Sequence, residues 1–102
     1  MINEIKKDLR KLANPNKIAD YQRFFKTGKG EYGEGDIFLG IKVPEQRKIA
    51  KKYSNLGLND IQKLLSSKIH EHRLVSLFIL IDKYKKANDN EKKQITNFYL
   101  KN

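Results

Sequence analysis

The sequence predicts an all-α protein of about six helices, on the strength of three observations. Apolar residues recur at spacings of three and four along most of the chain, as they do on one face of a helix. Asparagine, proline and glycine interrupt that pattern at intervals, which marks helix ends and turns. A chain of 102 residues allows one small core, so a single domain covering residues 1–102 is expected.

The first part of the chain predicts two helices that meet at Asn14-Pro15. The apolar stripe that begins at Ile2 ends at Leu12, and asparagine caps helices while proline fits a first helical position. A second helix is therefore expected to run to about Lys26. Residues 27–36 contain four of the six glycines and predict a loop. Residues 37–43 have no evident partner strand, so we expect an extended, buried connector.

The remainder predicts four more helices. One begins at Pro44 and ends near Tyr53, and a short one covers about 59–66. The next, about 69–86, is apolar around most of its circumference, so it should be central and packed on several sides. Asn88 and Glu91 have the spacing of a capping box and predict the start of the last helix. Paired in sequence, such helices have the size of α-solenoid repeats, although a plain bundle stays possible.

The charge of the chain favours an acidic partner. Twenty-two basic and twelve acidic residues give +10, and the excess is spread along the chain instead of forming a tail. Nucleic acid is the partner that such a balance favours, and a lysine-rich solvated surface is the simpler alternative. The chain has no cysteine, which excludes disulfides and thiol chemistry. Its apolar runs are far shorter than the roughly 20 residues of a membrane span, and its N-terminus lacks the apolar stretch of a secretory signal. We therefore expect a cytoplasmic, nucleoid-associated protein.

The short motifs give little support to catalysis or metal binding. Residues 28–33 match G-x-G-x-x-G, but a helix precedes them and acidic residues follow, so nucleotide binding is not expected. His70 and His72 are two residues apart and would point to different sides of a helix, so no metal site is predicted. We expect both on the helix surface, with Glu71 and Arg73 as buried or interface contacts. No nucleophile with its base stands out, and no cofactor is predicted.

Two longer stretches together resemble a known family. The first runs from Arg23 through the glycines and contains F-L-G-I-x-x-P-x-x-R at 38–47. The second is H-E-x-R at 70–73, followed by K-Y-K-K at 83–86. In combination they resemble the N-terminal part of the DNA alkylation repair family of HEAT-like-repeat glycosylases, the AlkD type. The resemblance covers the chain from roughly residue 20 onward.

That resemblance implies a curved HEAT-like α-solenoid with duplex DNA on its basic face, and an enzyme that excises N3- or N7-alkylated purines. The family's catalytic Trp and Asp lie in an N-W-D-type segment beyond the region that corresponds to 97–102, and this chain has no Trp. We therefore expect no catalytic residue here. The chain would be the N-terminal, DNA-binding and scaffold portion of a longer repair protein, and would be inactive alone.

Four residues are candidate DNA contacts. Phe24 and Lys42 match an aromatic and a polar position on the family's DNA face, and Arg47 or Lys48 could reach a phosphate from the next helix. Core packing is the alternative for Phe24, a solvated loop for Lys42, and an ion pair with Glu45 or a contact with the glycine loop for Arg47.

Two further expectations concern partners. A non-catalytic helical-repeat module that binds nucleic acid or protein is the main alternative to a repair enzyme, and a basic protein of the membrane surface is a third possibility. The last helix places Phe98, Tyr99 and Leu100 near its end, and an exposed apolar patch there would favour self-association.

Overall fold

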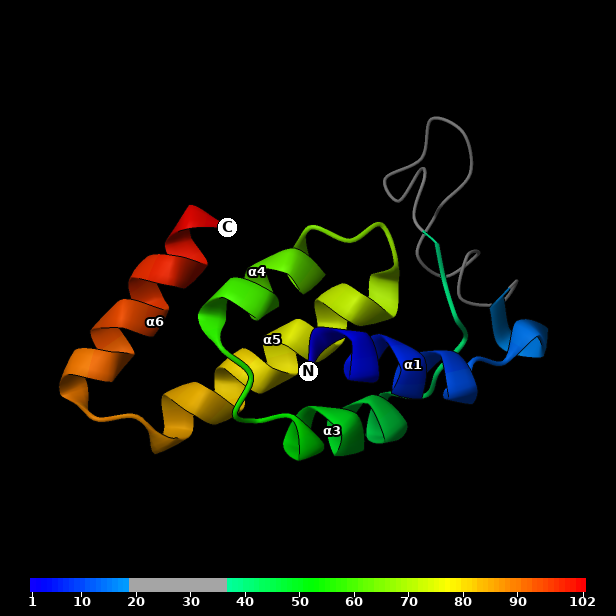
Figure 1. Cartoon of the computed structure of the whole chain (residues 1–102), viewed down its shortest axis with the longest axis horizontal. Helices are drawn as coiled ribbons and strands as arrows, with labels where there is room; N and C mark the ends of the chain where they lie inside the picture. The colour runs from blue at the N-terminus through cyan, green and yellow to red at the C-terminus, as the bar shows by residue number, and fades with distance from the viewer. Residues whose placement is uncertain (19–36) are drawn as a thin grey trace.

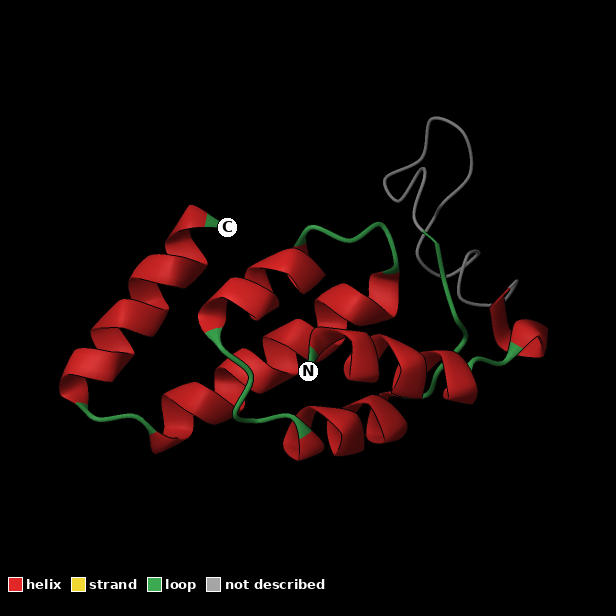
Figure 2. Cartoon of the chain, in the orientation of Figure 1, coloured by secondary structure: helices red, strands yellow, loops and turns green. Residues whose placement is uncertain are grey.

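A computed structural model describes residues 1–18 and 37–102 of the chain. Within these ranges the regular structure is helical, apart from an isolated parallel bridge between Ile37 and Ile69 (Figure 2). The predicted all-α class is confirmed. The bounded helices are α1 (Ile2–Leu12), α3 (Val43–Lys52), α4 (Leu58–Leu65), α5 (His70–Lys86) and α6 (Asp89–Lys101).

The predicted second helix is described only at its start. Residues 15–18 are helical, directly after Asn14, as the asparagine and proline signals predict. The remainder of that helix, to about Lys26, lies outside the described residues. So do the glycine-rich stretch 27–36 and the G-x-G-x-x-G match within it.

Helix α5 is the centre of the fold. It packs against α1, α3, α4 and α6, most extensively against α3 and α4 (Figure 1). Its side chains are buried or half-buried around most of the helix because neighbours cover several sides. The prediction of a central helix is confirmed. The buried apolar side chains that form the core are Ile5, Leu9, Ile41, Ile49, Ala50, Tyr53, Leu56, Ile61, Leu64, Val75, Ile79, Leu80 and Ile95.

The start of α6 is the predicted capping box. The Glu91 amide donates to the Asn88 side-chain oxygen at 2.8 Å, and the Asn88 amide donates to the Glu91 carboxylate at 3.1 Å. Two amides that a helix start would leave unpaired are thereby satisfied.

The extended segment 37–42 is held by hydrogen bonds from both sides. The Ile37 amide donates to the Lys68 carbonyl at 3.0 Å, and the Ile37 carbonyl accepts from the His70 amide at 2.8 Å. On the other side, the Leu39 carbonyl accepts from the Asn14 amide at 2.7 Å. The segment therefore joins the end of α1 to the start of α5, as a strand would, without a sheet.

Glu71 accepts hydrogen bonds from three further amides of this segment. It is fully buried at the start of α5, and its carboxylate accepts from the amides of Leu39, Gly40 and Ile41 at 3.0, 3.0 and 3.4 Å. Backbone amides buried without partners are costly, so the carboxylate makes burial of this turn possible. The prediction that Glu71 is a buried polar contact is confirmed.

Gly40 is required where the segment turns. Its φ is +76°, and a Cβ built on it would lie 2.2 Å from the Asn14 carbonyl oxygen. Both the left-handed backbone and the close approach exclude a side chain here. This explains the glycine of the F-L-G-I motif in physical terms.

Two sequence expectations need correction. The connector predicted over 37–43 is buried at Phe38, Gly40 and Ile41, but Ile37, Lys42 and Val43 are exposed, and Val43 already belongs to α3. His72 is 5 % exposed and is not a surface residue. The apolar core surrounds α5 on the side that carries His72, Val75 and Ile79, so the histidine is enclosed with them.

Replacing Gly40 with alanine should destabilise the protein severely. We expect the free energy of unfolding to fall by about 3 kcal/mol or more, because Ala would combine a strained φ with a collision against backbone. Gly57→Ala is the matched control, since Gly57 has open space around it, and its effect should stay within about 1 kcal/mol. Urea unfolding of both variants tests this, and equal losses would contradict it.

Replacing Glu71 with glutamine should also destabilise the fold, although the two side chains have the same shape. The amide nitrogen of Gln would face backbone N–H groups and leave at least one without an acceptor. We expect a loss on the order of 3 kcal/mol in the free energy of unfolding. Glu45→Gln is the control, because it removes the same charge from the first turn of α3. It should lower the free energy of unfolding by only about 0.5 kcal/mol. A small effect of Glu71→Gln in thermal or urea unfolding would refute this role.

Candidate nucleic-acid interface

The described candidate DNA contacts lie on or beside α3. Lys42 is the residue before the helix, with an extended backbone at φ −66° and ψ 145°, and its side chain is exposed. Arg47 and Lys48 are exposed within the helix. Phe24 lies outside the described residues. All three described candidates therefore offer their charge to solvent, but they do not form one cluster.

Arg47 faces α5. Its guanidinium carbon lies 5.2 Å from the centre of the Phe78 ring, a distance typical of a cation–π contact. The two residues line a hollow between the helices together with Lys51, Ile81, Asp82 and Lys85. The contact recorded for Arg47 is thus with an aromatic ring, and no ion pair between Arg47 and Glu45 occurs within the described part of the chain.

Lys48 faces the other flank of α3. It lines a second hollow, between α1 and α3, whose remaining lining residues are Asp8, Lys11, Leu12, Glu45, Ile49 and Lys52. Consecutive residues point about 100° apart on a helix, which separates Lys48 from Arg47. A single phosphate could not engage both side chains on one face.

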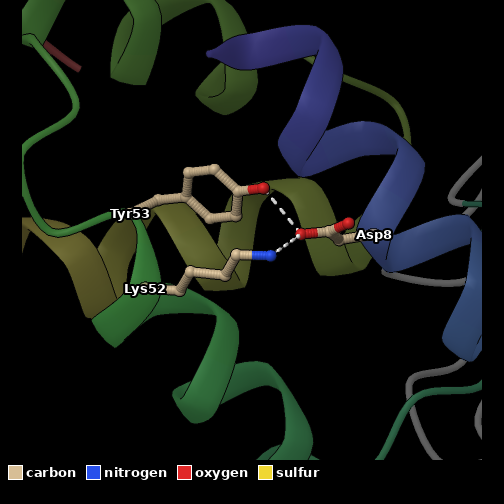
Figure 3. A network of polar contacts seen from close by, with 3 residues as sticks. All are labelled: Asp8, Lys52 and Tyr53. Atoms are coloured by element: carbon tan, nitrogen blue, oxygen red, sulfur yellow. Dashed lines mark hydrogen bonds and ion pairs between the residues drawn. The ribbon is translucent and has the colours of Figure 1, made fainter.

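Asp8, which lines this second hollow, connects α1 to the end of α3. Figure 3 shows its contacts with Lys52 and Tyr53. Its Oδ2 accepts from the Tyr53 hydroxyl at 2.6 Å and from the Lys52 ammonium at 2.9 Å. The hydrogen bond from Tyr53, then that from Lys52, lowers the pKa of Asp8. The hydrogen bond from Lys52 to Asp8 raises the pKa of Lys52. The hydrogen bond from Tyr53 to Asp8, together with burial, raises the pKa of Tyr53. Lys52 is therefore engaged in the fold and is a poor candidate for an outside partner.

Two cations that line the first hollow, Lys51 and Lys85, were not among the DNA contacts predicted from the sequence. Lys51 follows Arg47 by one helical turn, and Lys85 follows Phe78 by two turns on α5. The four-residue spacing on α3 could have indicated Lys51. Nothing in the sequence could show that Lys85, on another helix, reaches the same hollow.

A serine and a histidine meet at the turn before α5, a pair that no sequence pattern indicates. Ser67 Oγ lies within hydrogen-bond distance of His72 Nδ1, at 3.0 Å, and it accepts a hydrogen bond from the Ile69 amide at 3.1 Å. Burial, with Lys6 next in importance, lowers the pKa of His72. The ring is 5 % exposed and is closed to a substrate, so the pair stabilises the turn.

Of the three residues predicted to form an apolar patch on α6, only two are exposed. Phe98 packs against the core, while Tyr99 and Leu100 are 58 % and 75 % exposed. Self-association through α6 stays a prediction. Within residues 1–18 and 37–102, no helix has the length and apolar character needed to cross a membrane, and no group of three His, Asp or Glu side chains could hold a metal.

The observations so far define a basic, all-α protein whose exposed cations flank a central helix. Comparison with known proteins gives a family. The sequence profile of the DNA alkylation repair enzyme family matches residues 5–102, nearly the whole chain. No curated protein and no solved structure matches significantly. The chain belongs to the DNA alkylation repair enzyme family.

The Asp8 contact predicts a pH-dependent stability. Tyr53→Phe removes one hydrogen bond and should lower the free energy of unfolding by about 1 kcal/mol at pH 7. Because the pKa of Asp8 is lowered in the folded protein, the contact stabilises above the unfolded value of 3.8 and is lost as pH falls through the folded value. The difference between wild type and variant should therefore shrink in acid.

The control for this experiment is Tyr84→Phe. Tyr84 is 45 % exposed, so loss of its hydroxyl should change stability by less than about 0.5 kcal/mol at any pH. Thermal unfolding between pH 3 and 7 measures both variants. A Tyr53→Phe deficit that stays constant over this range would show that Asp8 is not the partner that matters.

Proposed function

We propose that this chain is the DNA-binding and scaffold part of a DNA alkylation repair glycosylase that excises N3- or N7-alkylated purines, the catalytic residues lying outside these 102 residues. The observation that carries the proposal is the family match over residues 5–102 in a chain that has a charge of +10 and no tryptophan. Membership accounts for DNA as the partner, and the charge accounts for affinity to its backbone.

The placement of the exposed cations supports binding to phosphates. Lys42 precedes α3, and Arg47 and Lys51 lie along the flank of α3 that borders α5. Cations carried on a helix that packs on the central helix are held at fixed separations, as contact with a regular polyanion requires.

The absence of tryptophan supports the division between binding and catalysis. Excision of a cationic alkylated base calls for an aromatic face near the lesion and for a carboxylate that stabilises positive charge developing on the sugar. Asp8 and Glu71 are engaged in hydrogen bonds that hold the fold together. We therefore assign DNA affinity and support of a HEAT-like solenoid to this chain, and no catalytic step.

Two measurements on the 102-residue chain test the proposal. A fluorescent duplex of about 20 base pairs should bind, with log K falling linearly as log[salt] rises, because phosphate contacts release counterions. The same chain should release no 7-methylguanine from methylated duplex DNA above a buffer control. Absence of DNA binding at low salt would favour a protein-binding module, and release of the base would show that catalysis resides in this chain.

A further inference from the structure

The hollow between α3 and α5 is lined by both apolar and basic side chains. It encloses about 230 Å³. Among its lining residues, Phe78 is half-buried and Ile81 is 50 % exposed, and Arg47, Lys51 and Lys85 supply three cations. Asp82 is its one acidic lining residue. Three positive charges around one hollow repel each other, which a partner of opposite charge would relieve.

These cations are available for such a partner. The ion pairs recorded among the described residues join the N-terminus to Glu4, Lys52 to Asp8, and Lys63 to Asp60, so none of the three takes part. Arg47 is nevertheless oriented, because its guanidinium carbon lies over the Phe78 ring at 5.2 Å. A guanidinium has five N–H donors, so Arg47 can contact the Phe78 ring and still donate hydrogen bonds to an anion.

The apolar lining residues narrow the choice of anion that could bind in this hollow. A free phosphate would gain nothing from the exposed Ile81 side chain, whereas a nucleic-acid strand brings the carbon atoms of its sugar beside each phosphate. The combination of cations and apolar surface therefore fits a phosphodiester with its attached deoxyribose better than an isolated ion.

We propose that Arg47, Lys51 and Lys85 together bind one phosphodiester group of a DNA strand, with Phe78 positioning Arg47 and Ile81 lying against the sugar. This inference rests on the proposed function, and it adds a defined site to a general affinity. It joins α3 and α5 through the ligand, and it leaves Lys48, on the other flank of α3, outside the site.

The first test removes the three charges together. Arg47→Gln, Lys51→Gln and Lys85→Gln in one protein should reduce the steepness of log K against log[salt] by about 0.9, the contribution of a single phosphate. Three separate phosphate contacts would instead remove about 2.7. The control is Lys7→Gln, Lys63→Gln and Lys93→Gln, which lowers the net charge equally with exposed residues of α1, α4 and α6 and should leave that slope nearly unchanged.

The second test asks whether the two helices share one ligand. Arg47→Gln and Lys85→Gln should each weaken duplex binding by about tenfold, as loss of a charged hydrogen bond does. If both hold the same phosphate, the double variant should bind about ten- to thirtyfold more weakly than wild type, well short of the hundredfold expected for independent sites. The single variants also serve if the triple variant fails to fold, which circular dichroism would reveal.

The outcomes separate this inference from the proposed function. Wild-type protein that fails to bind DNA at low salt would overturn both. Wild-type binding with equal salt slopes in the two triple variants, or with multiplicative losses in the double variant, would overturn the shared phosphate site and leave general DNA binding in place. A slope reduced by about one phosphate, together with coupled losses, would establish the site.

Discussion

The hydrogen bonds from three consecutive backbone amides to the Glu71 carboxylate are the interaction on which the rest of the structure depends. A buried carboxylate is costly unless its oxygens are satisfied, and a buried irregular segment is costly unless its amides are. Here the amides donate to the carboxylate oxygens over N···O distances of 3.0–3.4 Å, so both groups are satisfied. The result is a turn of extended chain locked against the start of the central helix, in a fold whose described residues form no sheet.

This contact also determines where α3 begins. The segment that Glu71 holds ends at Ile41, whose carbonyl accepts from the Gln46 side chain at 2.8 Å, and the helix starts two residues later. At its other end, Tyr53 and Lys52 are bonded to Asp8 of α1. Helix α3 is thus fixed at both ends by polar contacts and along its length by α5. A helix restrained in this way can hold cations at set positions.

Features that depend on residues a few positions apart could be predicted from the sequence. Helix limits, the capping box at Asn88 and the central place of α5 follow from spacing and from residue types within a few positions, and the structure agrees. Burial of Glu71 was also foreseen, but not its partners. The contacts that shape the candidate site join residues about 30 to 45 apart, as in Tyr53 with Asp8 and Arg47 with Phe78. Such pairings depend on helix packing, so no local pattern reveals them, and the enclosure of His72 escaped prediction for the same reason.

The Phe78 ring that Arg47 contacts affects how tightly an anionic partner binds. A long arginine side chain loses rotamer freedom when it binds, at a cost of about 0.5–1.5 kcal/mol. The cation–π contact with Phe78, whose ring centre lies 5.2 Å from the guanidinium carbon, restricts that freedom already in the free protein. Part of the entropy loss then belongs to folding and not to association, so the incoming strand meets a guanidinium that is largely preorganised, while the lysines beside it remain adaptable. Arg47 would thereby set the register of contact, and the lysines would follow the strand.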